Sequence, residues 1–160
     1  MTTPPKIAGM LETGICVDDL KRVSAFYREV LGLPAVMEID RLHAFALAPG
    51  EVLLLFDRAL AQHDSHTPRG VVPGHRTDGR AHFAFRIRAE DYEPWKRHLA
   101  AQGIEVTSEV SWPGGGVSFY FNDPEGNVLE MATPGLWANY PAEFVECEAR
   151  PERVGDGAES

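Results

Sequence analysis

The sequence predicts an α+β fold built from two β-α-β-β-β modules. A strand, helix and three-strand pattern occurs twice along the chain, in the same order and at similar spacing. Each copy ends in a tight turn between two strands, "APGE" in the first and "NDPEGN" in the second. The hydrophobic content of 44% is sufficient for a buried core. These observations divide the chain into an arm (1–8), a first module (9–57), a linker (58–79), a second module (80–137) and an acidic tail (138–160).

The first module opens with alternating apolar residues over 11–17, which predict a strand. Asp18 or Asp19 is placed to cap a helix that ends at Gly32. Apolar residues recur at helical spacing and form one face of this helix: Val23, Phe26, Tyr27, Val30 and Leu31. Three short strands are then expected, over 35–39, 42–48 and 51–56.

The second module repeats this plan. A strand over 82–87 leads to an acidic helix start at Glu90 and Asp91. The helix directs Trp95 and Leu99 inward and ends at Gly103. The three strands that follow are expected over 104–110, 117–121 and 127–132.

Aligning the two copies pairs residues that carry different chemistry. Glu12 aligns with His82 on the first strands, and Gly32 aligns with Gly103. On the last strands "GEVLL" aligns with "GNVLE", so Leu54 is the counterpart of Glu130.

Composition excludes several function classes. The net charge of -9 and a pI near 5.1 argue against nucleic acid as a partner, because phosphate binding needs a basic surface. No apolar run is long enough to span a membrane, and we expect a soluble, cytoplasmic protein. Two distant cysteines support neither a disulfide framework nor a thiolate zinc site.

The linker and the tail are read as weakly structured. The linker is rich in Pro, Gly and His, and its three histidines have no spacing that fits a rigid metal site. We therefore expect a solvated loop there. The acidic tail is expected to be weakly ordered and anchored by Trp137, Tyr140 and Phe144.

Two stretches, "VDDLKRVSAFYREVLGL" and "FNDPEGNVLE", resemble the vicinal oxygen chelate superfamily. That superfamily includes glyoxalase I, extradiol dioxygenases, and fosfomycin- and bleomycin-resistance proteins. The resemblance covers about residues 11–137. It implies that the two modules form a cup-shaped, eight-stranded mixed sheet with a divalent metal at its base.

In this superfamily the metal ligands come from the first and last strands of the modules. Carried onto this chain, those positions are Glu12, Leu54, His82 and Glu130. Leu54 has no donor atom, so the implied ligands are Glu12, His82 and Glu130, with Leu54 left to contact substrate. Most relatives have His at the position of Glu12. Two carboxylates and a neutral imidazole carry a charge of -2, which balances a divalent ion such as Mn, Fe, Mg, Zn, Ni or Co.

The resemblance implies a metal-dependent enzyme that acts on a small substrate through two neighbouring oxygens, as a lyase, isomerase or dioxygenase. "FYFNDPEGNVLE" resembles the end of the extradiol dioxygenase signature, which makes Tyr120 the candidate catalytic residue. The histidine that this signature places upstream is missing from "VSWPGGGVSF".

Two alternatives stay open beside the enzyme. One is a metal-free protein of the bleomycin-resistance type that sequesters a small molecule, for which Trp112 and Tyr120 supply aromatic contacts. The other is an interaction domain that has kept the fold without its chemistry. Exposed sheet edges favour a homodimer, and the resemblance to the superfamily implies the same state of assembly.

Overall fold

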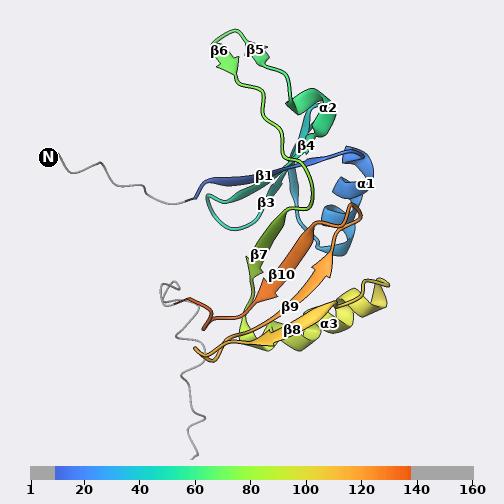
Figure 1. Ribbon diagram of the computed structural model, residues 1–160, viewed down its shortest axis with the longest axis vertical. Coiled ribbons are helices and arrows are strands. Elements are labelled where there is room, and N and C mark those ends of the chain that lie inside the picture. Colours follow the sequence, from blue (N-terminus) through green and yellow to red (C-terminus); the bar gives the residue numbers. More distant parts are fainter. Residues whose placement is uncertain (1–9, 138–160) are drawn as a thin grey trace, which may run out of the picture. The chain divides into compact units, whose positions relative to one another are not determined.

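The computed structural model describes residues 10–137, and these form two compact units (Figure 1). The first unit contains residues 10–82 together with 122–128. The second contains residues 83–121 together with 129–137. The chain thus passes between the units three times, and the turn after residue 121 groups with the first unit.

The first unit holds a four-stranded sheet in which the first and last strands of the module lie side by side. Its spatial order is β1 (Glu12–Val17), β4 (Val52–Asp57), β3 (Leu42–Ala46) and β2 (Ala35–Ile39). β1 runs parallel to β4, whereas the other neighbours are antiparallel. The parallel pair brings Glu12 opposite Val52, and Gly14 opposite Leu54.

The predicted helix of the first module is present as α1 (Leu20–Ala25), continued by a π-helical turn η1 (Phe26–Val30). Asp19 caps it, because its side chain accepts a hydrogen bond from the backbone N–H of Arg22 at 3.0 Å. Val23 and Tyr27 are fully buried on the predicted apolar face, and Tyr27 packs against Phe45 of β3. This face anchors the helix on the sheet.

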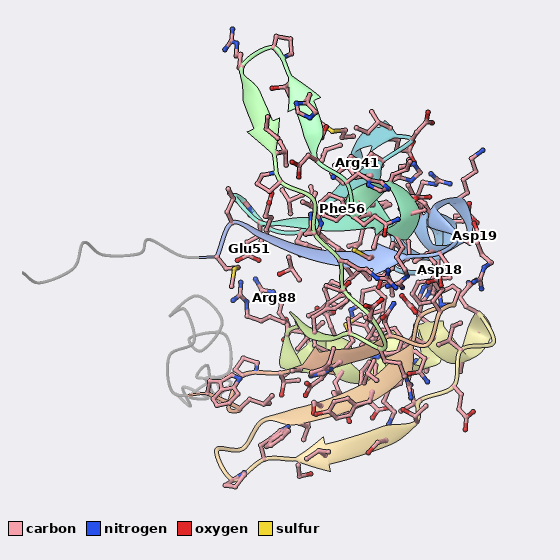
Figure 2. All side chains as sticks on the ribbon, turned by 45° about the horizontal axis from the view of Figure 1, so that its top comes forward. Asp18, Asp19, Arg41, Glu51, Phe56 and Arg88 are labelled. Carbon is pink, nitrogen blue, oxygen red and sulfur yellow. The ribbon has the colours of Figure 1, made fainter. Side chains whose placement is uncertain are left out.

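The segment predicted as a solvated loop contains secondary structure. It forms a short helix α2 (Arg58–Ala61) and a hairpin of β5 (Ser65–Thr67) and β6 (Gly70–Val72). Asp57 caps α2 by accepting from the N–H of Leu60. At the other end of α2, the guanidinium of Arg41, which is labelled in Figure 2, donates to the carbonyls of Leu60 and Ala61. Polar side chains thus satisfy the ends of a helix too short to show periodicity in the sequence.

The second unit carries a four-stranded sheet with the same plan. Its spatial order is β7 (His82–Arg86), β10 (Val128–Ala132), β9 (Val117–Asn122) and β8 (Ser108–Ser111). A 3-10 turn η2 (Ala89–Asp91) leads into α3 (Tyr92–Ala101), which lies along this sheet (Figure 1). Apolar side chains fill the space between them: Leu99, Phe119, Phe121, Leu129 and Met131 are at most 2% exposed.

The α+β class and the two β-α-β-β-β modules are confirmed, with eight strands arranged in two four-stranded sheets. The strand predicted over 104–110 forms later, at Ser108–Ser111, and Trp95 is half-buried where Leu99 is fully buried. The N-terminal arm and the acidic tail, which contains Tyr140 and Phe144, lie outside the described residues. None of the helices within residues 10–137 is long and apolar enough to cross a membrane.

Candidate functional site

Two backbone hydrogen bonds fix the register of β7 against β10. Val128 donates its N–H to the carbonyl of Ala81, and Ile87 donates to the carbonyl of Ala132. This spacing is that of a parallel pair with His82 opposite Val128, and it places Ala84 opposite Glu130. Because side chains alternate along a strand, His82, Ala84 and Arg86 share one face of the sheet with Glu130.

The neighbouring pair, β9 and β10, is antiparallel. The N–H of Thr133 donates to Val117, and the N–H of Asp123 donates to Asn127. Counting inward from these pairs places Tyr120 directly opposite Glu130 and Ser118 opposite Ala132. Since Phe119, Phe121, Leu129 and Met131 face α3, Glu130 and Tyr120 lie on the face opposite α3. We call this face, with His82, Arg86, Trp112, Tyr120 and Glu130, the polar face of the second sheet.

Glu130 is a buried carboxylate, with 5% of its surface exposed. Its Oε1 atom accepts no hydrogen bond from the described residues, while the side chain is hydrogen-bonded to Tyr120. Burial raises the pKa of Tyr120, and the bond to Glu130 raises it further. The phenol is therefore neutral at physiological pH and acts as the donor to the carboxylate.

A directional series of hydrogen bonds leads to this pair. The indole Nε1–H of Trp112 donates to Ser118 Oγ at 3.0 Å. An indole nitrogen can only donate, so Ser118 accepts there, and its own hydroxyl is hydrogen-bonded to Tyr120, which lowers the pKa of that phenol. Trp112, Ser118, Tyr120 and Glu130 thus form one polarised series, of the kind that holds side chains in a fixed orientation.

His82 is oriented by the strand beside it. Its Nδ1 atom lies 3.0 Å from the carbonyl oxygen of Val128. A carbonyl oxygen only accepts, so Nδ1 carries the proton in this contact, and in the neutral ring the lone pair is on Nε2. Metal-binding histidines commonly have this arrangement, with the second nitrogen bonded to a backbone carbonyl.

Glu12 and Leu54 belong to the first sheet. Glu12 lies opposite Val52 in β1 as His82 lies opposite Val128 in β7, and Leu54 is opposite Gly14 as Glu130 is opposite Ala84. The structure therefore has the residue equivalences that the repeat predicts. Within residues 10–137, no three side chains of His, Cys, Asp or Glu lie close enough together to hold a metal ion. The structure groups His82, Trp112, Tyr120 and Glu130 on one sheet and leaves Glu12 and Leu54 on the other.

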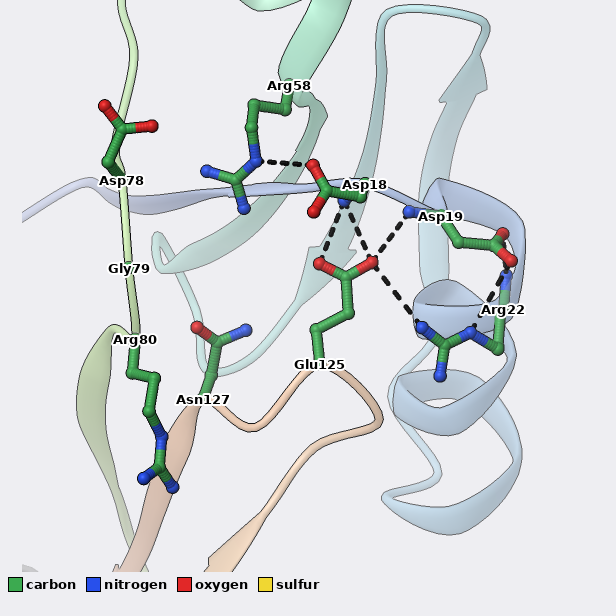
Figure 3. A pocket seen from close by; sticks show the side chains of 9 residues that line it. All are labelled: Asp18, Asp19, Arg22, Arg58, Asp78, Gly79, Arg80, Glu125 and Asn127. Carbon is green, nitrogen blue, oxygen red and sulfur yellow. Dashed lines mark hydrogen bonds and ion pairs between the residues drawn. The ribbon is translucent and has the colours of Figure 1, made fainter.

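A pocket of about 580 Å³ lies in the first unit, around the start of α1 (Figure 3). Glu125 enters it from the "NDPEGN" turn and accepts hydrogen bonds from the N–H groups of Asp18 and Asp19, at 2.9 and 2.7 Å. Arg58 donates to Asp18 at 2.6 Å and to the carbonyl of Cys16 at 2.7 Å. The charges lining this pocket are largely paired with one another, so they serve to fasten the turn to α1.

Sequence reasoning missed Arg86. It is four residues after His82, and the alternation of a strand puts both side chains on the same face. The alternation of side chains along a strand was therefore sufficient to predict that Arg86 shares a face with His82. The pairing of Glu125 with the start of α1 had no such signal, because it joins residues 106 and 107 positions apart.

Comparison with known proteins gives consistent results. The family model of the glyoxalase/bleomycin resistance protein/dioxygenase superfamily matches residues 9–131. The chain is 29% identical over 137 residues to glutathione transferase FosA of Serratia marcescens, covering 86% of each protein.

Solved structures agree in fold. Lactoylglutathione lyase from Agrobacterium tumefaciens is 34% identical, with a TM-score of 0.75 over 85% of this chain and 99% of that one. An integron cassette protein from a Halifax Harbour sewage metagenome is 26% identical, with a TM-score of 0.63 over 79% of this chain and 98% of that one. The chain belongs to the glyoxalase/bleomycin resistance protein/dioxygenase superfamily.

Proposed function

We propose that this protein is a divalent-metal-dependent enzyme whose substrate binds the metal through two adjacent oxygens. The observation that carries the proposal is the buried Glu130 carboxylate, which shares a sheet face with His82. A buried carboxylate is costly to keep ionised, by several kcal/mol, unless a positive charge or hydrogen bonds compensate it. The hydrogen bond from Tyr120 supplies part of that compensation, and a divalent cation would add a positive charge.

The donor types of the proposed ligands suit this ion. His82 presents Nε2 in the tautomer that its contact with Val128 selects, and Glu130 supplies carboxylate oxygen. The third ligand in the proposal is Glu12, which has in β1 the register position that His82 has in β7. Oxygen ligands with one imidazole suit Mn²⁺, Fe²⁺ or Mg²⁺, and also Zn²⁺, Ni²⁺ or Co²⁺. When bound, the metal supplies Lewis-acid stabilisation of negative charge that develops on a substrate oxygen.

The remaining residues orient the site. Tyr120 keeps its proton and donates it in a hydrogen bond to Glu130, which holds the carboxylate in one rotamer. Trp112, anchored on Ser118, presents an aromatic surface on the same face, and Leu54 is the apolar contact contributed by β4. The reaction classes that this arrangement suits are lyase, isomerase and dioxygenase chemistry.

The named relatives suggest where to look for the substrate. Glutathione transferase FosA and lactoylglutathione lyase are both named for glutathione. We therefore propose glutathione, or a glutathione conjugate with adjacent oxygens, as the first substrate to test. A cytoplasmic homodimer is part of the same proposal.

Titration of metal-free protein with Mn²⁺ by calorimetry tests the metal. One ion per chain is expected, with affinity at least about tenfold weaker in Glu130→Gln and His82→Gln, since even indirect partners of metal ligands contribute that much. Glu12→Gln tests the third ligand in the same way. Glu90→Gln, an exposed carboxylate in η2, is the matched control and should bind as the wild type does.

The proposal of a metal-dependent enzyme is overturned by two results together. These are negligible binding of Mn²⁺, Zn²⁺ and Ni²⁺ by the wild type and unchanged stability of Glu130→Ala. Retention of small aromatic ligands by metal-free protein would then favour a sequestering function. The observation behind that second candidate is that Trp112 and Tyr120 lie on one sheet face.

A further inference from the structure

The side chain of Asn127 connects the turn before β10 to the residue that precedes β7. Its Oδ1 atom accepts a hydrogen bond from the backbone N–H of Ala81 at 2.9 Å. The next residue, Val128, donates its own N–H to the carbonyl of Ala81 at 2.8 Å. Two consecutive residues thus bind both backbone groups of Ala81. This contact lies directly before His82, the first residue of β7.

The orientation of the Asn127 amide is fixed from its other side. Its Nδ2 group donates to Oδ2 of Asp123 at 2.8 Å, and its backbone N–H donates to Oδ1 of the same carboxylate at 2.9 Å. An ionised carboxylate only accepts, so Nδ2 must face Asp123 and Oδ1 must face Ala81. Asn127 and Asp123 are 4% and 5% exposed, and the buried phenol of Tyr27 also donates to Asp123, at 3.2 Å. This buried series presents the amide oxygen to Ala81 in one orientation.

The position of β7 depends on few contacts. It lies at the edge of the second sheet, and within residues 10–137 β10 is its only neighbouring strand. A slip of one residue in such a pair would turn His82 to the opposite face of the sheet. The Asn127 amide opposes this slip, because its fixed oxygen meets the N–H of Ala81 only in the observed register. All of these bonds join residues of the first unit.

We propose that Asn127 is a positioning residue for the metal site, whose amide holds His82 in the register and in the tautomer that metal binding needs. This inference rests on the proposed function. In the observed register Nδ1 of His82 lies 3.0 Å from the carbonyl oxygen of Val128, so the neutral ring carries its proton on Nδ1 and its lone pair on Nε2. In this role Asn127 touches neither metal nor substrate. It acts through Ala81, and Asp123 acts one step further away by fixing the amide.

The tautomer of His82 tests this role without any metal. Long-range proton–nitrogen correlation spectra of isotope-labelled, metal-free protein show which ring nitrogen carries the proton, and His82→Gln identifies the signals of this ring. The wild type should carry the proton on Nδ1. Asn127→Leu keeps a branched side chain but removes the acceptor, so it should populate the Nε2 tautomer as well. It should also bind Mn²⁺ at least about tenfold more weakly in calorimetry, as is usual when a residue that orients a metal ligand is lost.

An exchange of the two buried side chains keeps the test valid if Asn127→Leu does not fold. In the double variant Asp123→Asn/Asn127→Asp, position 127 still accepts from the N–H of Ala81, and position 123 donates to it. This double variant should have the wild-type tautomer and Mn²⁺ affinity. Asp123→Asn alone should lose both, because position 123 can then no longer accept from the Asn127 amide and fix its orientation.

Asn122→Ala is the matched control. Asn122 is the neighbouring amide in the same turn, and its Oδ1 accepts from the Arg80 guanidinium at 2.9 Å instead of from the backbone beside β7. This variant should keep the wild-type tautomer and Mn²⁺ affinity.

Three results overturn the role of Asn127 alone. They are a wild type with the His82 proton on Nε2, a folded single variant that keeps the Nδ1 tautomer or the wild-type Mn²⁺ affinity, and a folded double variant without the wild-type tautomer. A wild type that binds no Mn²⁺ overturns the proposed function and this inference with it.

Discussion

At the scale of single residues, Glu125 has the most consequential set of contacts outside the polar face. Its carboxylate is 10% exposed, accepts from two backbone N–H groups at the start of α1, and lies 3.7 Å from the Arg22 guanidinium (Figure 3). Negative charge at this end of a helix is favourable, because the first N–H groups have no partner within the helix.

Glu125→Ala leaves those N–H groups without their acceptor. We expect the free energy of unfolding to fall by about 2 kcal/mol, within the usual range for hydrogen bonds to a charged group. Urea denaturation followed by circular dichroism measures this change. Glu29→Gln, which removes an exposed carboxylate beside Arg28, should change it by less than about 0.5 kcal/mol. Equal losses in the two variants would contradict the role given to Glu125.

For the candidate site, the sequence was most informative about individual residue positions. The repeat alone aligned Glu12 with His82 and Leu54 with Glu130, and the strand registers have the same equivalences. It could not reveal the bond of Trp112 to Ser118, because that contact depends on the exact turn between β8 and β9.

At the scale of elements, α3 is attached to its sheet by a charged cluster as well as by its apolar face. Tyr92 donates to Glu109 of β8 at 2.9 Å, and Lys96 donates to the same carboxylate at 2.9 Å. Burial, and after it the hydrogen bond to Glu109, together raise the pKa of Tyr92 to about 12. The folded protein therefore favours the protonated phenol.

The pH dependence follows from this direction. The pKa of Tyr92 is higher in the folded than in the unfolded chain, so its contribution to stability is complete below about pH 10 and is lost as the pH rises towards 12. Tyr92→Phe should show a smaller loss of stability across that range. Absorbance of tyrosinate near 295 nm should likewise show one fewer late-titrating tyrosine. If Tyr92→Phe and the wild type have the same alkaline titration, the late-titrating phenol is not that of Tyr92.

Element boundaries show where sequence patterns stop being sufficient. Several strands were predicted to within one or two residues, as in β2, β9 and β10. The β5–β6 hairpin was missed because its strands have three residues each and no apolar alternation, and its residues are mostly exposed. It is defined instead by local bonds such as that of Thr67 Oγ1 to the Gly70 carbonyl.

At the scale of the whole molecule, the edge of the first sheet bears on the state of assembly. All five residues of β2 are exposed, and Val36, Met37 and Ile39 are each at least 50% exposed. An uncovered apolar edge strand tends to pair with another chain. This observation supports the proposed homodimer.

Light scattering coupled to gel filtration tests that assembly. The wild type should elute as a dimer, and Met37→Lys should shift it towards monomer, because a charge on an edge strand opposes pairing. Leu60→Lys, at an exposed apolar position in α2, is the control and should remain dimeric. A monomeric wild type, or dimers in all three proteins, would rule out β2 as the interface.

The route of the chain between its two units has a consequence for how the protein can be divided. Residues 122–128 belong with the first unit, while the strand residues on either side of them belong with the second. Neither unit is a continuous piece of polypeptide, so a fragment ending near residue 82 would lack Glu125, the carboxylate that accepts from the N–H groups of Asp18 and Asp19 at the start of α1. The two halves of the duplicated pattern are consequently interdependent.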